Sequence, residues 1–203
     1  LKAGYTSVAE FHYVHHDTDG QPYADEATMT WAVADAAHDA GMGLTVLPVL
    51  YERAGFAQPA LRPDQRRFAG TPEFIARLHR KVQAAGRPLV NAGVSIHSLR
   101  AASAKSIAAL LAQVGDADVP IHIHVAEQMQ EVRDCVAATG LRPIAWLAEH
   151  QKMDARWQLV HATHTEQAEI DAVARSGAGI VICPSTEGGQ RCGIFCELSV
   201  AIW

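Results

Sequence analysis

Short apolar runs alternate with longer helical patterns along most of this 203-residue chain. The helical patterns carry their own boundary signals: Thr71 and Pro72 suit a helix start, and Gly86 suits a helix end. Strands that alternate with helices pair in parallel through right-handed crossovers, so the sequence predicts an α/β fold with about six strands. The predicted strands cover residues 5–11, 44–50, 89–96, 121–126, 157–162 and 179–183.

Five helical segments are expected between these strands. Ser103 is expected to cap the helix that precedes the strand at 121–126, and Thr165 to cap the last helix. The segments are residues 25–40, 72–86, 103–114, 131–149 with a break near Gly140 and Pro143, and 165–177.

The composition excludes several classes of partner. The net charge is -5, from 17 basic and 22 acidic residues, and the chain has no basic run suited to a phosphate backbone, so nucleic acid is not an expected partner. No apolar stretch is long enough to cross a bilayer and no signal segment opens the chain, so no membrane partner and a cytoplasmic location are expected. The four cysteines form no C-x-x-C pair, which predicts free thiols.

Polar and ionisable residues gather directly after every predicted strand. An open sheet and a closed barrel share the same alternation, but a barrel gathers all its strand ends around one site, whereas an open sheet binds ligands at one switch point. The pattern therefore favours a barrel. The residues concerned are Tyr13, His15, His16, Glu52, Arg53, His97, Arg100, His124, Glu127, His161, His164, Thr186 and Glu187.

The most specific local pattern is the segment that holds His122, His124 and Glu127. Strand alternation places the two histidines on one face, and Glu127 falls in the turn beyond the strand. An imidazole there can bind a divalent metal while the carboxylate moves protons to and from an activated water. The alternative is two buried histidines held by hydrogen bonds and a glutamate favoured by a helix N-terminus.

Three other segments carry candidate chemistry. His161 ends the next strand and can reach the same metal or its water, although a single strand-end histidine is also a common structural feature. The loop from His97 to Arg100 suits a carboxylate, because arginine offers a planar fork; the alternative is a solvated loop. Residues 10–17 contain three histidines, but their spacing does not favour a metal site.

Several segments together resemble the formimidoylglutamate deiminases of the amidohydrolase superfamily. The resemblance covers residues 1–187, taken as one partial domain, and residues 188–203 form a divergent tail for which no site is predicted. The strand-end histidines and Glu127 alone would also fit guanine deaminases or chlorohydrolase-like enzymes. The resembling segments are residues 10–17, 48–56, 65–68, 97–100, 122–128 and 159–164.

The resemblance implies the fold and the chemistry. The fold would be the central six βα units of a TIM-type (β/α)8 barrel, incomplete at both ends, with one zinc ion. The substrate would be N-formimidoyl-L-glutamate of histidine degradation, hydrolysed to N-formyl-L-glutamate and ammonia. His124 would bind the metal, Glu127 would carry protons, and His161 would orient the water or polarise the imine. Tyr13, His97 and Arg100 would bind the substrate.

The chain also departs from this family. It lacks the His-x-His pair of the first barrel strand and the aspartate of the eighth, so its strands match the second to the seventh. Because catalytic zinc needs about three protein ligands, we expect the 203-residue chain to bind zinc weakly and to lack activity by itself. A non-catalytic barrel remnant is the alternative of a different class. Association of two copies into a homodimer is compatible with the sequence.

Overall fold

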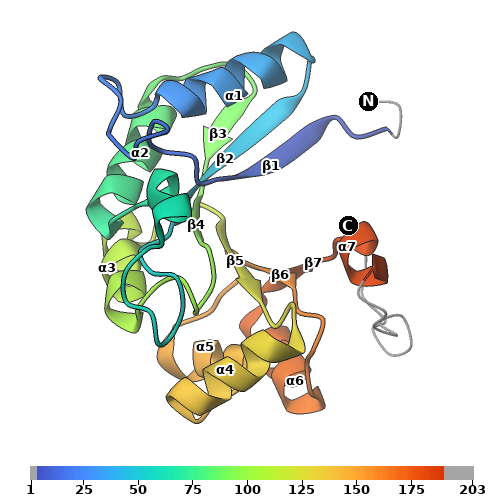
Figure 1. The fold of residues 1–203 in the computed structure, drawn as a ribbon. Coiled ribbons are helices and arrows are strands. Elements are labelled where there is room, and N and C mark those ends of the chain that lie inside the picture. Colours follow the sequence, from blue (N-terminus) through green and yellow to red (C-terminus); the bar gives the residue numbers. More distant parts are fainter. Residues whose placement is uncertain (1–3, 190–203) are drawn as a thin grey trace. The chain divides into compact units, whose positions relative to one another are not determined.

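The computed structural model describes residues 4–189 and divides into two compact units, one up to Ile123 and one from His124. In the first unit, strands and helices alternate, except that two short strands follow each other before the last helix (Figure 1). Its elements are β1 (Ser7–His12), α1 (Thr28–Asp39), β2 (Gly43–Leu50), the 3-10 helix η1 (Pro63–Phe68), α2 (Pro72–Ala84), β3 (Val90–Ala92), β4 (Val94–Ile96), α3 (Ala104–Val114) and most of β5 (Ile121–Val125).

The second unit repeats the alternation on a smaller scale. It begins with the last residues of β5, and its helices α4 and α5 follow each other before the next strand (Figure 1). Its other elements are α4 (Met129–Thr139), α5 (Pro143–His150), β6 (Trp157–His161), α6 (Gln167–Ser176), β7 (Gly179–Val181) and α7 (Pro184–Gly189). The predicted tail lies outside the described residues from residue 190 on, together with Cys192 and Cys196.

All strand pairs described within the units are parallel, as the alternation predicts. In the first unit the strands pair in the order β1-β2-β4-β5, and β3 pairs with β2. In the second unit β6 pairs with β7, with Leu159 opposite Ile180. The carboxyl ends of neighbouring strands within each unit therefore lie at the same edge, which is where the predicted site residues follow.

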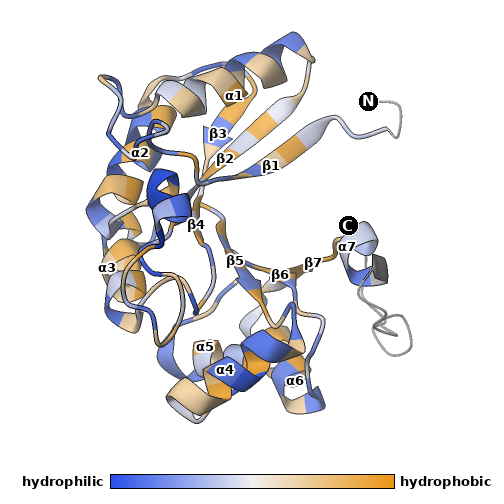
Figure 2. Ribbon diagram, in the orientation of Figure 1, coloured by the Kyte–Doolittle hydropathy of each residue, from blue (hydrophilic) through white to orange (hydrophobic). Residues whose placement is uncertain are grey.

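Apolar side chains from strands and helices form the core of the first unit. Leu44 and Val46 of β2 pack with Ala34 of α1, Val82 of α2 and Ala92 of β3. Helices α2 and α3 show hydrophobic and hydrophilic residues mixed along their length, as expected for helices with one buried face (Figure 2).

Two predicted boundaries are wrong. The strand expected at 89–96 is interrupted at Gly93, where β3 ends and β4 begins. Thr165 does not cap α6; Glu166 is the N-cap, and its side chain and that of Glu169 form a reciprocal capping box. The expected break between α4 and α5 is confirmed, with Gly140 in the left-handed region and Pro143 in the first turn of α5.

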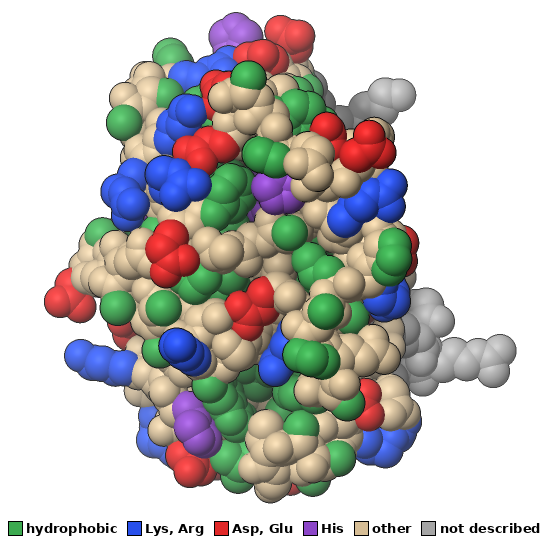
Figure 3. All heavy atoms as spheres, turned by 60° about the vertical axis from the view of Figure 1, so that its left-hand side comes forward, with side chains coloured by type: hydrophobic (Ala, Val, Ile, Leu, Met, Phe, Trp, Pro, Cys, Tyr) green, Lys and Arg blue, Asp and Glu red, His purple; other side chains and the backbone are tan. Residues whose placement is uncertain are grey.

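On the face shown in Figure 3, Lys and Arg side chains are interspersed with Asp and Glu side chains. Among the described residues, no helix has the length and apolarity needed to span a bilayer. Cys135 and Cys183 are free thiols, as the cysteine spacing predicts.

Candidate active site

Three of the predicted residues meet in the second unit, at the carboxyl ends of β5 and β6. The imidazole rings of His124 and His161 stack, with centroids 5.5 Å apart and planes 20° from parallel. The Nε2 atom of His161 lies 3.9 Å from Oε1 of Glu127, in the turn after β5. The structure thus brings two imidazoles and a carboxylate together where the sequence places them.

The turn that carries Glu127 is held by a second carboxylate. Glu131 is buried in the first turn of α4, and it accepts hydrogen bonds from the backbone N–H groups of Ala126 (3.1 Å) and Glu127 (3.0 Å). These bonds fix a strained backbone, because Ala126 has a φ of 51°. Glu131 was not predicted from the sequence; its position four residues after Glu127, in a helix start, was the available signal.

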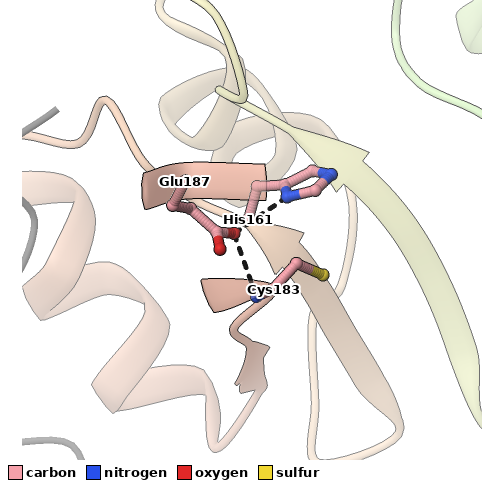
Figure 4. A group of neighbouring side chains, drawn as sticks. All are labelled: His161, Cys183 and Glu187. Atoms are coloured by element: carbon pink, nitrogen blue, oxygen red, sulfur yellow. Dashed lines mark hydrogen bonds and ion pairs between the residues drawn. The ribbon is translucent and has the colours of Figure 1, made fainter. Parts of the chain in front are cut away.

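Glu187, in α7, contacts the Nδ1 side of the His161 ring (Figure 4), whereas Glu127 faces its Nε2 atom. Its Oε1 atom lies 2.9 Å from Nδ1 of His161 and accepts the backbone N–H of Cys183 at 3.0 Å. Burial, with Glu187 and Glu127 nearby, raises the pKa of the Cys183 thiol, so this cysteine is not an activated nucleophile. The sequence placed Glu187 at a strand end without giving it a role.

The predicted substrate-binding residues lie in the first unit, at the ends of β1 and β4. The rings of Tyr13 and His97 meet edge to face, with centroids 6.1 Å apart, and the Tyr51 ring lies 4.4 Å from His97. Burial raises the pKa of the Tyr51 hydroxyl, and the positive charge of nearby Arg100 opposes this shift. Tyr13, His97 and Arg100 therefore all neighbour Tyr51, a residue with no role predicted from the sequence.

The loop after β4 is held by the two residues that follow Tyr51. The Arg53 guanidinium donates hydrogen bonds to the carbonyls of Leu99 (2.8 Å), Arg100 (3.0 Å) and Ala102 (3.0 Å). The Glu52 carboxylate accepts the N–H of Ser103 at 2.6 Å, next to the start of α3. These strand-end charges thus support the loop that carries Arg100.

A cleft of about 350 Å³ opens beside Tyr51 in the first unit. Gln65 of η1 donates a hydrogen bond to the Tyr51 hydroxyl (2.8 Å), so η1 fixes the tyrosine at its wall. The cleft is lined by His16, Tyr51, Glu52, Leu61, Ala69, Gly70, Thr71 and Phe74.

The three histidines of residues 10–17 are packed into the protein. The rings of His12 and His15 contact each other at 5.5 Å, and both side chains are buried. His15 Nε2 lies 3.2 Å from the Val49 carbonyl and His16 Nε2 lies 2.9 Å from the Ala69 carbonyl. Backbone carbonyls therefore engage one nitrogen of His15 and one of His16, which agrees with a structural role.

Comparison with known proteins relates this geometry to a family. The model of the amidohydrolase family matches residues 1–194, which is most of the chain. The chain belongs to the amidohydrolase family.

Among curated amidohydrolase relatives, a formimidoylglutamate deiminase from Pseudomonas aeruginosa is 51% identical over 96% of this chain and 43% of its own length. A 5-methylthioadenosine/S-adenosylhomocysteine deaminase from Halobacterium salinarum is 36% identical over 44% of this chain and 21% of its own length. The chain therefore spans less than half the length of these relatives.

Solved structures confirm the expected fold. An amidohydrolase from Brucella melitensis matches with a TM-score of 0.88 and 46% identity, over 95% of this chain and 43% of that one. A zinc-bound atrazine chlorohydrolase from Arthrobacter aurescens matches with a TM-score of 0.73 and 20% identity, over 92% and 41%, which shows the fold alone. The chain thus forms an incomplete barrel of parallel strands with surrounding helices, as predicted.

The donor atoms present fit the metal chemistry typical of amidohydrolases. Imidazole, thiolate and carboxylate are all zinc ligands. Among the described residues, the side chains of His161, Cys183 and Glu187 offer donor atoms within 4.8 Å of one another, and His124 stacks on His161. The second unit can therefore supply ligands to a zinc ion, although the choice of His124 as a ligand stays a prediction.

Proposed function

We propose that this chain is part of an enzyme that hydrolyses N-formimidoyl-L-glutamate to N-formyl-L-glutamate and ammonia. The observation that carries the proposal is the cluster in the second unit: His161 stacks on His124, and its Nε2 atom faces Glu127 at 3.9 Å. The 51% identity to the Pseudomonas deiminase supports formimidoylglutamate as the substrate. Histidine degradation would then be the pathway.

The proposed reaction needs a nucleophile and a proton carrier. A zinc ion bound by His124 would lower the pKa of a water molecule and so supply the nucleophile near neutral pH. Glu127 would accept one proton from the water as the water oxygen bonds to the amidine carbon, and would pass it to the imine nitrogen. The remaining hydroxyl proton would follow to the same nitrogen, so that the C–N bond could break, ammonia could leave, and the carbon would keep the oxygen as a formyl group. His161 would orient the water or polarise the imine.

Tyr13, His97 and Arg100 would bind the glutamate part of the substrate. Arg100 offers two parallel N–H donors, which match the two oxygens of a carboxylate. The hydrogen bonds from Arg53 to the Arg100 loop hold this loop in place, which supports a binding role because recognition needs a pre-organised donor.

A substrate panel tests the proposal. Ammonia release is measured from formimidoylglutamate, guanine and 5-methylthioadenosine, with this 203-residue chain and with a longer protein that contains it and matches the relatives in length. We expect zinc-dependent turnover of formimidoylglutamate by the longer protein. Turnover of guanine or 5-methylthioadenosine alone would refute the assignment and favour another aminohydrolase. Failure of the longer, zinc-loaded protein to act on all three would favour a non-catalytic remnant.

A further inference from the structure

We propose that Glu187 is the positioning residue of His161: it keeps the proton on Nδ1 and turns Nε2 toward Glu127. This inference rests on the proposed function, because it explains how His161 would present an acceptor nitrogen to the reacting groups. It assigns a role to Glu187, a strand-end carboxylate of the second unit that has no role in the proposed reaction.

The hydrogen-bond pattern determines which atom carries the proton. The Oε1 atom of Glu187 lies 2.9 Å from His161 Nδ1, and it already accepts the N–H of Cys183 at 3.0 Å (Figure 4). Because Oε1 acts as an acceptor toward Cys183, we assign the hydrogen in its contact with His161 to Nδ1. In a neutral imidazole Nε2 is then the acceptor, and this is the atom 3.9 Å from Glu127.

Burial makes this contact selective. Glu187 is 2% exposed, and its second oxygen, Oε2, is buried without a hydrogen-bond partner among residues 4–189. A carboxylate shielded from water interacts more strongly with the few donors that reach it. In the described part of the chain, His161 Nδ1–H and the backbone N–H of Cys183 are those donors, so breaking the contact with His161 would leave the carboxylate poorly satisfied.

The backbone conformation at His161 is a second reason why the ring needs a hydrogen-bond partner to fix its direction. His161 has a φ of 73° and Ala162 a φ of 49°, in a region that non-glycine residues seldom adopt. The strand has therefore ended at His161, and regular strand geometry does not set the direction of its ring. Hydrogen bonds from the Ala162 N–H to the carbonyls of Val125 (3.0 Å) and Val160 (3.1 Å) hold the backbone, while Glu187 holds the ring.

A competing interpretation is that His161, Cys183 and Glu187 form a metal site of their own, since their donor atoms lie within 4.8 Å. The two interpretations differ in the metal-free protein. Positioning by Glu187 fixes the ring without any ion, whereas a metal site would leave the ring in exchange between tautomers until an ion binds.

The test is histidine NMR on the metal-free 203-residue chain, with ¹⁵N-labelled histidine and long-range ¹H–¹⁵N correlation. The H161N variant identifies the His161 signals by their loss. We expect wild-type His161 to be fixed with the proton on Nδ1, and E187A to shift it toward the Nε2–H tautomer. E187Q should retain most of the wild-type pattern, because its amide oxygen can still accept. E149A, which removes an exposed carboxylate of α5, is the matched control and should change nothing.

Two results would overturn the inference: a His161 ring in tautomer exchange in the metal-free wild type, or an unchanged tautomer in E187A. Should E187A fail to fold, folded E187Q carries the test. A His161 ring in E187Q that exchanges between tautomers, as it does in the unfolded chain, would refute the inference. In the longer protein, E187A should lower kcat by about 10–100-fold, the usual effect of losing a carboxylate behind a site histidine. A fixed tautomer in a protein without deiminase activity would refute the proposed function and leave the positioning role standing.

Discussion

Glu127 follows β5 at the point where the chain turns into α4, and its backbone N–H is held by Glu131. If Glu127 carries protons in the reaction, Glu127→Gln removes that ability while keeping the shape of the side chain. We expect the longer protein to keep its fold and zinc content but to lose about 100-fold or more in kcat. Ammonia release and bound metal are measured in parallel, with the exposed E149Q as control. A variant that keeps more than about a tenth of the wild-type kcat would exclude Glu127 from this role.

Arg100 and Arg53 lie close together but have different expected roles. Arg53 donates hydrogen bonds to backbone carbonyls, whereas Arg100 would bind substrate. Lysine keeps the charge but lacks the planar fork. We therefore expect Arg100→Lys to raise the KM for formimidoylglutamate about tenfold, since charged hydrogen bonds contribute about 1.5–3 kcal/mol, with zinc content unchanged. Steady-state kinetics test this, with the exposed R133K of α4 as control. An unaltered KM would remove Arg100 from the binding site.

At the residue level, the sequence located strand-end groups better than it located their partners. His124, Glu127 and His161 could be predicted to meet, because parallel strands bring their ends to one edge. The roles of Glu131 and Glu187 could not, because a carboxylate in a sequence does not reveal which donors it will find when buried. Those donors are two backbone N–H groups for Glu131, and one backbone N–H and one imidazole for Glu187.

The interruption between β3 and β4 depends on a glycine. A Cβ atom at Gly93 would lie 2.4 Å from the Pro120 carbonyl oxygen, 2.7 Å from Pro120 Cγ and 2.9 Å from Leu47 Cδ2. Two of these atoms belong to a backbone and a proline ring that cannot easily move. We expect Gly93→Ala to lower the free energy of unfolding by about 1–3 kcal/mol or more, as overpacking does.

Chemical denaturation of the 203-residue chain measures this change. Gly55→Ala is the matched control, because the nearest atom to its added Cβ is Gln58 Cβ at 4.0 Å. Equal unfolding midpoints for Gly93→Ala and the wild type would show that Pro120 and Leu47 can shift to accommodate the added Cβ atom.

The same glycine explains why one predicted strand was too long. Residues 89–96 were predicted as one strand, yet the strand is interrupted at Gly93, whose N–H donates a hydrogen bond to the Val46 carbonyl. Hydrophobic periodicity reports burial and not hydrogen-bond partners, so it cannot detect a change of pairing within a predicted strand. The predicted start of α6 was wrong for a related reason. Thr165 and Glu166 are both possible N-cap residues, and the hydrogen bond from Arg142 to Glu169, a tertiary contact, selects Glu166.

For the whole molecule, the barrel could be predicted only because chemistry and periodicity were read together. Alternation of strands and helices is equally compatible with an open sheet. The polar and ionisable residues after every predicted strand distinguished the two folds, and the match to the Brucella amidohydrolase confirmed the barrel. The homodimer and the zinc affinity of the 203-residue chain stay predictions, since they depend on surfaces and ligands that a sequence pattern does not place.

The buried histidines of the first unit predict how the stability of the chain depends on pH. Burial lowers the pKa of His12 to about 4, and burial, together with neighbouring His12, lowers that of His15 to about 3. Both groups bind protons more readily in the unfolded chain, where the ordinary histidine pKa is about 6.5. Their contribution to stability is therefore complete above about pH 6.5 and is lost as the pH falls from there toward the folded pKa values.

We expect the free energy of unfolding to decrease by several kcal/mol between about pH 7 and pH 4, because each pKa unit corresponds to about 1.4 kcal/mol. His15→Gln removes one of the two titrating groups and should make this decrease shallower, even if it lowers stability at neutral pH. His38→Gln, at an exposed position in the last turn of α1, should leave the slope unchanged. Urea titrations at a series of pH values measure the slope directly. A slope in His15→Gln equal to that of the wild type would mean that His15 does not remain neutral in the folded protein.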